Sequence, residues 1–362
     1  MVIENLDNKI LAYALKNAIE HEGKSQAGSV LSSLFHEGLE KSEVKNVIQK
    51  INDTVKKVNL NTIEDQKKRL DALGDLVSHR IGRAEDELPE LPNAENGVIM
   101  RFGPSPSGPL HVGHIISNMI QSLFVAKYGG KFYIRIEDTN PEKVLKEAYT
   151  QIKKDCDWIF GNVTEYIIQS DRIEIYYSYV KKLLDLEAVY ICSCSQEKFK
   201  EFSEKMIECP CRSLNKKTQE TRWKNMLEET GYKEGGAVLR FKTEKGMKDE
   251  NPAMRDFPLA RICLAKHPKQ GNKYRVWPLM NLAVTVDDIE LGMTHIVRGK
   301  DHRDNAERQK MIYKVLNKPF PWTSFIGRIK FTDLDLSKRK ITAKIESGEY
   351  EGYEDEKLPT VA

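Results

Sequence analysis

The sequence predicts an α/β protein built on a doubly wound parallel sheet of the Rossmann-like type. Two observations lead to this prediction. Short apolar runs that are typical of buried strands alternate with segments whose apolar residues recur at helical spacing. Polar residues of several chemical types follow directly after these runs, at the strand ends where open α/β sheets bind ligands. A helical domain is expected before the sheet domain, and an insert that contains cysteines is expected between the two halves of the sheet domain.

Residues 1–96 are expected to form a helical N-terminal extension and a linker. Apolar residues recur at helical spacing from Ile10 to Ile51. The charged segment 61–83 predicts a long solvated helix, and the acidic, proline-containing segment 85–96 predicts a linker. No cluster of titratable side chains stands out in this region. A structural role or contact with another protein is therefore expected for it.

A strand, a proline-rich loop and a helix follow in direct succession. The apolar run 98–100 predicts the strand, and the segment 115–127 predicts the helix. The loop between them reads Arg-Phe-Gly-Pro-Ser-Pro-Ser-Gly-Pro-Leu-His-Val-Gly-His and covers residues 101–114. Because His111 and His114 stand three residues apart, their side chains should face the same side of the helix start. The positive end of the helix dipole lies there too, which suits a polyphosphate.

The next strand and helix indicate a parallel arrangement. Residues 131–138 predict a strand, and a helix should begin near Asn140. A strand–helix–strand–helix order is typical of a parallel sheet. Arg101 and Glu137 would then emerge at the carboxyl ends of neighbouring strands, where ligands bind. Residues 97–191 are therefore interpreted as the first half of the sheet domain.

Four of the six cysteines form two Cys-x-Cys pairs within an insert predicted at residues 192–255. Two interpretations are open. The four thiolates can hold zinc in a closed tetrahedral site, which we favour, or the cysteines can pack as small apolar residues. Cys156 and Cys263 lie outside both pairs and are expected in the core. The residues of the two pairs are Cys192, Cys194, Cys209 and Cys211.

Residues 256–345 are interpreted as the second half of the sheet domain. Asp287 and Asp288 are expected to begin a turn before a buried strand within residues 294–302. A helix over residues 305–316 and a basic loop at 336–340 should follow.

Composition sets few limits on function. A length of 362 residues is enough for two or three domains. The net charge of +3 is too small to argue for or against a nucleic-acid partner. The N-terminus resembles no signal peptide and no apolar run reaches the length of a membrane span, so a cytoplasmic location is expected.

These motifs resemble those of class I aminoacyl-tRNA synthetases. The loop at 101–114 looks like the HIGH signature, and Leu-Ser-Lys-Arg at 336–339 resembles the KMSKR signature. The segments Arg-Ile-Glu-Asp-Thr-Asn-Pro, Met-Arg-Asp and Arg-Gly-Lys-Asp-His are similar to those of the archaeal and eukaryotic type of glutamyl-tRNA synthetase. This resemblance covers roughly residues 98–359. This resemblance implies ATP-dependent ligation of L-glutamate to tRNA(Glu) through a glutamyl-adenylate, with Mg2+. It also implies that the insert binds the tRNA acceptor stem.

The resemblance further implies residue roles. The catalytic residues would be His111, His114 and Lys338. The residues that bind ATP would be His111, Gly113, His114, Ser337, Lys338 and Arg339. The residues that bind glutamate would be Arg101, Ser105, Glu137 and Arg298. The chain departs from the family pattern at Asp335 and Leu336, where the signature has Lys and Met, and at Met280, where bacterial relatives carry tyrosine.

By the same resemblance, Arg298 matches the position that separates glutamyl from glutaminyl enzymes, where arginine marks the glutamyl side. A guanidinium only donates hydrogen bonds and pairs bidentately with a γ-carboxylate, whereas glutamine presents one oxygen and a repelling NH2 group. Three alternatives remain: a glutaminyl-tRNA synthetase, a short glutamyl-queuosine tRNA(Asp) synthetase and a non-catalytic tRNA-binding relative. Whether tRNA(Gln) is charged as well stays open.

Relatives of this type continue past residue 359 into anticodon-binding barrels, whereas this chain stops at Ala362. Residues 346–362 are interpreted as the start of that region, in a chain that is either a fragment or naturally short. Because phosphate and base contacts dominate RNA affinity, we expect the chain to charge tRNA poorly and with little sensitivity to the anticodon.

Overall fold

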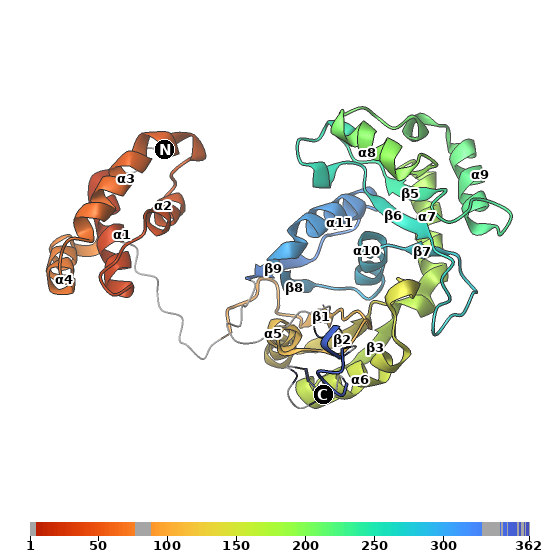
Figure 1. Ribbon diagram of the computed structural model, residues 1–362, viewed down its shortest axis with the longest axis horizontal. Coiled ribbons are helices and arrows are strands. Elements are labelled where there is room, and N and C mark those ends of the chain that lie inside the picture. The colour runs from red at the N-terminus through yellow and green to blue at the C-terminus, as the bar shows by residue number, and fades with distance from the viewer. Residues whose placement is uncertain are drawn as a thin grey trace. The chain divides into compact units, whose positions relative to one another are not determined.

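The computed structural model describes residues 5–76, 88–327, 341, 343–345, 347–352, 355, 358, 360 and 361. The chain divides into two compact units, Met1–Glu87 and Leu88–Ala362 (Figure 1). Among the described helices, none combines the length and the apolar character that a membrane span requires.

The first unit is helical, as the sequence predicts. Its helices are α1 (Leu6–Glu20), α2 (Ala27–His36), α3 (Val44–Val58) and α4 (Ile63–Ala72), with 3-10 turns at Lys41–Glu43 and Gly74–Leu76. Helix α1 packs against the other three, and Ile10, Leu15, Leu34 and Ile51 are fully buried between them. The side-chain amide of Gln66 donates to the carbonyl oxygens of Gly23 and Val58, at 3.0 Å each, which ties α4 to this core.

Helix α4 is shorter than the long helix predicted over residues 61–83. It begins after Thr62, whose hydroxyl accepts a hydrogen bond from the backbone N–H of Asp65. It ends at Ala72, shortly before Gly74, which has a positive φ of 58° that helical backbone cannot accommodate. The remainder of the predicted segment, residues 77–83, lies outside the described residues.

The second unit contains the predicted parallel strands. Strands β1 (Val98–Phe102), β2 (Gly130–Ile136) and β3 (Glu165–Ile168) pair in parallel in that order. Helices α5 (Val112–Tyr128) and α6 (Lys146–Phe160) make the connections. Strands β8 (His295–Gly299) and β9 (Trp322–Ile326) form a second parallel pair. The backbone N–H of Thr294 donates to the carbonyl oxygen of Ile99, which sets β8 beside β1.

The expected helix near Asn140 starts later than predicted. Pro141–Lys143 forms a 3-10 turn, and α6 begins only at Lys146. Residues 88–96, predicted as part of a linker, pack on this unit. The backbone N–H of Leu91 donates to the hydroxyl of Tyr128 at 3.0 Å, and Nε2 of His295 donates to the carbonyl oxygen of Pro92 at 2.8 Å.

An antiparallel sheet separates the two halves of the parallel domain in sequence. Its strands are β4 (Val189–Cys192), β5 (Val238–Phe241), β6 (Pro258–Ile262) and β7 (Val276–Pro278), in that order. Between β4 and β5 lie α8 (Gln196–Glu204), a 3-10 turn at Pro210–Ser213 and α9 (Lys216–Leu227). The predicted helix between the cysteine pairs corresponds to α8, which Ser195 caps by accepting from the backbone N–H of Lys198.

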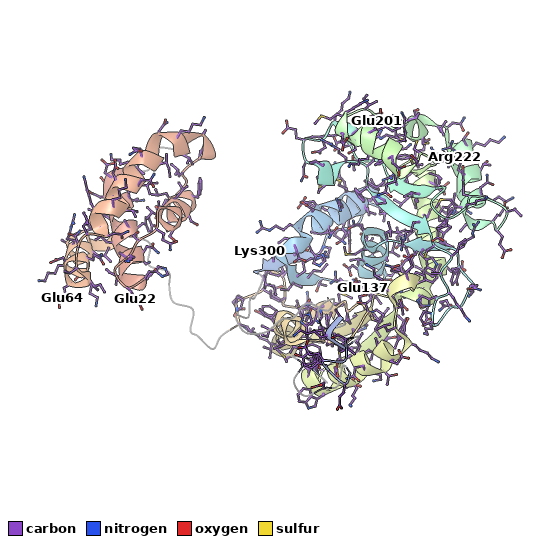
Figure 2. All side chains as sticks on the ribbon, in the orientation of Figure 1. Glu22, Glu64, Glu137, Glu201, Arg222 and Lys300 are labelled. Atoms are coloured by element: carbon purple, nitrogen blue, oxygen red, sulfur yellow. The ribbon has the colours of Figure 1, made fainter. Side chains whose placement is uncertain are left out.

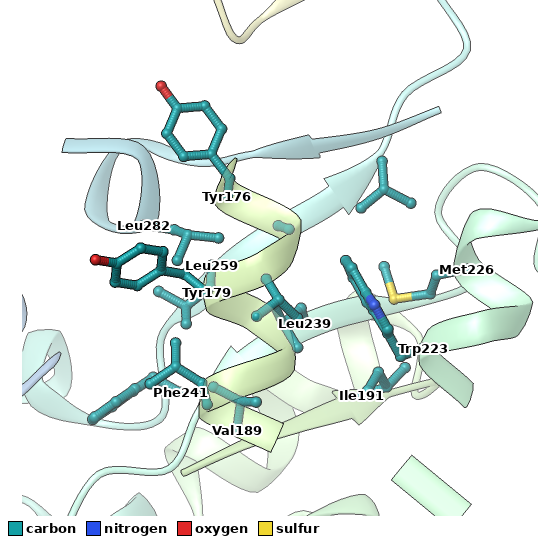
Figure 3. Packing of buried hydrophobic residues seen from close by; sticks show 14 of the residues in the cluster. Tyr176, Tyr179, Val189, Ile191, Trp223, Met226, Leu239, Phe241, Leu259 and Leu282 are labelled. Carbon is teal, nitrogen blue, oxygen red and sulfur yellow. The ribbon is translucent and has the colours of Figure 1, made fainter. Parts of the chain in front are cut away.

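This sheet is wider than the insert predicted at 192–255. It takes β4 from the segment assigned to the parallel domain, and it takes β6 and β7 from the segment assigned to the second half. A buried strand has the same apolar pattern whichever partner it pairs with, so the pattern alone did not reveal the antiparallel partners. Helix α7 (Ile173–Asp185) packs against this sheet, and its Tyr176 and Tyr179 belong to the same buried cluster as Leu239 (Figure 3).

Two further helices complete the second unit. Helix α10 (Met280–Glu290) packs against α7, β6 and α11 (Arg303–Val315), and a 3-10 turn at Lys300–His302 precedes α11. Asp287 and Asp288, predicted to begin a turn, lie inside α10 and are buried. The prediction failed because both carboxylates are neutralised by arginines from distant segments, which allows them to occupy a buried helix face. The chain reverses only at Gly292, where φ is 67°.

Candidate active site

The histidine motif lies at the start of α5, as predicted. His111 is the N-cap residue, and its backbone N–H donates to Nδ1 of His114 at 3.2 Å. The two imidazole rings stack with centroids 3.7 Å apart and an angle of 24° between their planes. Both side chains are partly exposed. The structure therefore brings two imidazoles together at the positive end of a helix of 17 residues.

Backbone hydrogen bonds fix the proline-rich loop that precedes these histidines. The carbonyl oxygen of Pro104 accepts from the N–H of Glu137 at 2.9 Å, and that of Pro106 accepts from Leu145 at 2.8 Å. The loop is thereby joined to the end of β2 and to the start of α6. At its other end, the N–H of Val361 donates to the carbonyl oxygen of Leu110 at 2.9 Å.

A buried ion-pair network lies under the carboxyl ends of β1 and β2. Nε and Nη2 of Arg101 donate to the two carboxylate oxygens of Asp288 at 2.8 and 3.0 Å. Arg135 donates to the same carboxylate at 2.5 Å and to Glu137 at 2.8 Å. Burial alone would raise the pKa of Asp288, but the two guanidiniums hold it below its ordinary value. Asp288 is therefore an anion that fixes both arginines.

Asp287, the neighbouring residue, faces a different set of partners. Its carboxylate accepts from Gln169 at 2.9 Å, from Arg172 at 2.7 Å and from the hydroxyl of Tyr176 at 2.9 Å. Consecutive residues of a helix point in different directions, so the two aspartates bind different segments. Helix α10 thus joins the parallel sheet through Asp288, and it joins α7 and the segment before α7 through Asp287.

Arg298, at the end of β8, is in a different situation from Arg101 and Arg135. Its Nη1 donates to Oε1 of Gln309 at 2.9 Å. Its Nε is buried and has no hydrogen-bond partner among the described residues. Within residues 88–327, no carboxylate forms an ion pair with it. Burial, together with the nearby charge of Arg101, lowers the pKa of Arg298 to about 10. A guanidinium in this position favours an anionic ligand.

Several groups share the electrostatic environment of Arg298. The charges of Arg101, Asp288 and Glu137 all act on it, and burial followed by the charge of Arg298 lowers the pKa of His302. Three predicted glutamate-binding residues, Arg101, Glu137 and Arg298, are therefore close together. Figure 2 labels Glu137, which follows β2, and Lys300, which follows β8. Ser105, the fourth predicted residue, is exposed on the loop.

Gly103 is required for the position of Glu137. A Cβ atom added to Gly103 would lie 2.4 Å from Oε1 of Glu137, which is closer than non-bonded atoms approach. The glycine therefore leaves the space that the carboxylate occupies. Gly103 was not among the predicted site residues, although it belongs to the loop that resembles the HIGH signature.

The sequence analysis missed four polar residues of this region: Arg135, Asp287, Asp288 and Gln309. A signal existed for the aspartates. Leu282, Ala283 and Val286 precede them at helical spacing, so a buried helix with two charged residues could have been predicted. A buried charge needs a partner, and this points to arginines elsewhere in the chain. Gln309 gives no comparable signal in sequence.

Asp138 and His267 connect the end of β2 to the antiparallel region. The carboxylate of Asp138 accepts from the N–H and the hydroxyl of Ser170, at 2.7 Å each, and from Tyr149 at 2.5 Å. Nδ1 of His267 accepts backbone hydrogen bonds at 3.1 Å from residues 269 and 270, so its Nε2 carries the proton. Nε2 then donates to the carbonyl oxygen of Asp138 at 3.0 Å. Both side chains are fully buried, which indicates a structural role.

The four predicted metal-ligating cysteines come together at one end of the antiparallel sheet. All four sulfur atoms lie within 4.8 Å of one another. The sulfur–sulfur distances are 3.6 Å for Cys192–Cys209, 3.6 Å for Cys194–Cys209 and 3.9 Å for Cys194–Cys211. Zinc–sulfur bonds of about 2.3 Å in a tetrahedron place sulfurs about 3.8 Å apart. The arrangement therefore fits a tetrahedral zinc site.

Ser337, Lys338 and Arg339, predicted to bind ATP, lie outside the described residues.

Known proteins resemble this chain in sequence. The family described as "tRNA synthetases class I (E and Q), catalytic domain" matches residues 97–362. The glutamate–tRNA ligase of Methanocaldococcus jannaschii is 42% identical over 357 residues, which cover 98% of this chain and 63% of that protein. That of Methanosphaera stadtmanae is 41% identical over 360 residues, which cover 99% and 63%. The chain thus spans less than two thirds of the length of these relatives.

A solved structure shares the fold. A glutamate tRNA ligase from Elizabethkingia meningosepticum, crystallised in complex with its amino acid, superposes with a TM-score of 0.52 and 21% identity. The superposition covers 68% of this chain and 53% of that chain. The predicted resemblance and fold class are confirmed: the chain belongs to the class I tRNA synthetases for glutamate (E) and glutamine (Q), with their catalytic domain at residues 97–362.

Proposed function

We propose that this chain carries the catalytic part of a glutamate–tRNA ligase, which joins L-glutamate to the 3′ end of tRNA(Glu). The observation that supports the proposal most strongly is the environment of Arg298. Its guanidinium lies at the carboxyl end of a parallel strand, has an amide partner in place of a carboxylate and is close to Arg101 and Glu137. In this proposal, the γ-carboxylate of the bound glutamate forms the ion pair with Arg298.

The same residues suggest how the amino acid is oriented. Glu137 offers an anion for the α-ammonium group, and Arg135 holds this carboxylate in place at 2.8 Å. Arg101 uses Nε and Nη2 for Asp288, which leaves Nη1 to face the ligand. Because Asp288 fixes the guanidinium, little ordering is needed when the substrate binds, and pre-ordered groups of this kind lower the cost of binding.

The first reaction step joins an oxygen of the glutamate α-carboxylate to the α-phosphorus of ATP. The bond between that phosphorus and the leaving pyrophosphate breaks, so negative charge increases on the pyrophosphate. We assign the stabilisation of this charge to His111 and His114 at the start of α5, with the backbone of Gly113 close to the phosphates. Mg2+ would enter with the ATP phosphates and neutralise part of their charge. Lys338, Ser337 and Arg339 would act in the same step by resemblance.

In the second step, a terminal ribose hydroxyl of tRNA attacks the glutamyl carbonyl carbon and releases AMP. We propose that the antiparallel sheet and its helices bind the acceptor stem. We also propose that Cys192, Cys194, Cys209 and Cys211 hold a structural zinc ion in this part, because their sulfur separations fit a tetrahedral site. The ion would fix the turn at Pro210–Ser213 against β4.

ATP–pyrophosphate exchange tests the function. Exchange is measured with glutamate and with glutamine, in the presence and absence of tRNA(Glu) and tRNA(Gln). We expect exchange with glutamate and none above background with glutamine, and tRNA(Glu) should support the reaction. Exchange with glutamine alone would show a glutaminyl enzyme instead. Absence of exchange under every condition, in folded protein that binds ATP, would favour a non-catalytic relative.

A further inference from the structure

The side-chain partner of Arg298 among the described residues is the amide of Gln309. We propose that Gln309 is a positioning residue that sets specificity for an anionic side chain: its neutral amide orients Arg298 without neutralising it. The γ-carboxylate of the substrate then becomes the counter-ion. This inference rests on the proposed function and extends it to a residue that does not itself bind the substrate.

Hydrogen-bonding chemistry fixes the orientation of the Gln309 amide. Gln309 lies in α11 and is 2% exposed. Arginine has donors only, so the amide oxygen must face Nη1 of Arg298, at 2.9 Å. The amide nitrogen then faces Oδ1 of Asn281 at 3.3 Å. Asn281 in turn donates to Asn305 at 3.3 Å. A row of three neutral amides thus supports Arg298 from behind.

The contrast with the neighbouring arginines is chemical. Arg101 and Arg135 both contact the carboxylate of Asp288, and Arg135 contacts Glu137 as well. Arg298 is held by an amide of similar size and reach. A glutamate at position 309 would occupy the same space as the glutamine but would carry a negative charge. The identity of this one residue therefore decides whether Arg298 is neutralised by the protein.

The charge balance of the pocket supports this interpretation. The ion-pair network joins three guanidiniums to three carboxylates, and the guanidinium of Arg298 forms no ion pair within residues 88–327. The paired guanidiniums belong to Arg101, Arg135 and Arg172, and the carboxylates to Glu137, Asp287 and Asp288. Free glutamate carries one net negative charge, whereas glutamine carries none. The pocket is therefore matched to glutamate, and a carboxylate at position 309 would match it to the neutral amino acid.

The experiment compares Gln309→Glu with Gln309→Met in the full 362-residue chain. The probes are the sulfamoyl-adenosine analogues of glutamyl- and glutaminyl-adenylate, whose dissociation constants are measured by calorimetry. In Gln309→Glu, we expect the preference for the glutamyl analogue to fall by about tenfold or more, because the new carboxylate behind Arg298 neutralises its guanidinium. Gln309→Met removes the hydrogen bond but adds no charge. It should weaken binding while the preference stays within about threefold of wild type.

A carboxylate at a second position distinguishes the effect of charge from a local folding defect at position 309. Asn281→Asp places a carboxylate one amide further from Arg298 and should lower the preference in the same direction by a smaller factor, since Coulomb energy falls with distance. Wild-type preference in both carboxylate variants, with unchanged melting temperature, would overturn the role of Gln309 while the proposed function stands. A wild-type chain that binds the glutaminyl analogue more tightly would overturn both.

Discussion

The guanidinium of Arg101 and the carboxylate of Asp288 form a buried bidentate ion pair between residues that are 187 positions apart in sequence. Arg101 belongs to β1 in the first half of the parallel domain, and Asp288 belongs to α10 in the second half. Because Arg135 contacts the same carboxylate, one aspartate holds two side chains at the base of the proposed pocket.

Replacing Asp288 by asparagine should destabilise the second unit by about 3–5 kcal/mol, because two buried guanidiniums lose their shared anion. Chemical denaturation monitored by tryptophan fluorescence measures this change. Asp157→Asn is the matched control, since its carboxylate is 50% exposed and pairs with Lys153 on the surface of α6. The control should unfold as wild type does. Equal unfolding midpoints for the two variants would contradict the structural role of Asp288.

The same variant should change the response to acid. The arginines hold the folded-state pKa of Asp288 below its ordinary value of 3.8. Its contribution to stability is therefore fully present above that pH and is lost as the pH falls through the lower folded value. The difference in unfolding free energy between wild type and Asp288→Asn should shrink below about pH 4. A difference that stays constant from pH 7 to pH 3 would argue against an ionised Asp288.

Replacing Arg298 by glutamine should reduce kcat/KM for glutamate by an amount equivalent to about 2–4 kcal/mol, the range for truncating one member of a buried charge pair. Lys314→Gln removes a positive charge from α11, where the lysine is 81% exposed, and should leave the kinetics unchanged. Steady-state exchange kinetics compare the two. Unaltered glutamate kinetics in Arg298→Gln would remove this residue from the pocket.

Purified, reduced protein should contain close to one equivalent of zinc. Cys209→Ser should release the metal, because the remaining three thiolates no longer close the tetrahedron. Cys263→Ser, a change at a buried cysteine outside the cluster, should retain it. Metal analysis by mass spectrometry gives the stoichiometry, and loss of zinc should impair tRNA charging more than ATP binding. Wild-type protein without metal would exclude the proposed zinc site.

Gly103→Ala should displace the carboxylate of Glu137, since the added methyl group would lie 2.4 Å from its Oε1 atom. Overpacking of this kind costs about 1–3 kcal/mol, so the KM for glutamate should rise by roughly tenfold or more. ATP affinity should change less. Gly28→Ala is the comparison, because no atom lies within 4 Å of the added methyl group there. Equal glutamate KM values in the two variants would refute the steric argument.

Much of the parallel domain was predictable because its signals are local. The apolar run before Arg101, the helical spacing after His114 and the polar residues after β8 each identify an element and its ligand-binding end. The same holds for the two Cys-x-Cys pairs, whose sulfurs the fold does bring together. Patterns of this kind involve only a few neighbouring residues, so they can be recognised without knowledge of the tertiary structure.

What escaped prediction depends on distant partners. Two adjacent aspartates suggest a turn when their segment is considered alone, and only the arginines at positions 101 and 172 explain their place in a buried helix. Strand β4 looks like any buried strand until β5 pairs with it in the antiparallel direction. A role for Gln309 can be inferred only from its contact with Arg298. Each of these contacts joins segments whose proximity no local pattern encodes.

The sequence separation between Arg101 and Asp288 also affects when their ion pair can form during synthesis. A ribosome that adds about 5–20 residues per second needs roughly 10–40 s to make the chain between them. Once Arg135 has been added, the nascent chain contains both histidines of the α5 motif and the two arginines, yet the shared anion of Asp288 has not been synthesised. The helical N-terminal unit can fold early, whereas the pocket is completed only after the antiparallel sheet and α10 have been synthesised. The order of synthesis therefore delays the completion of the proposed substrate site until α10 has been made.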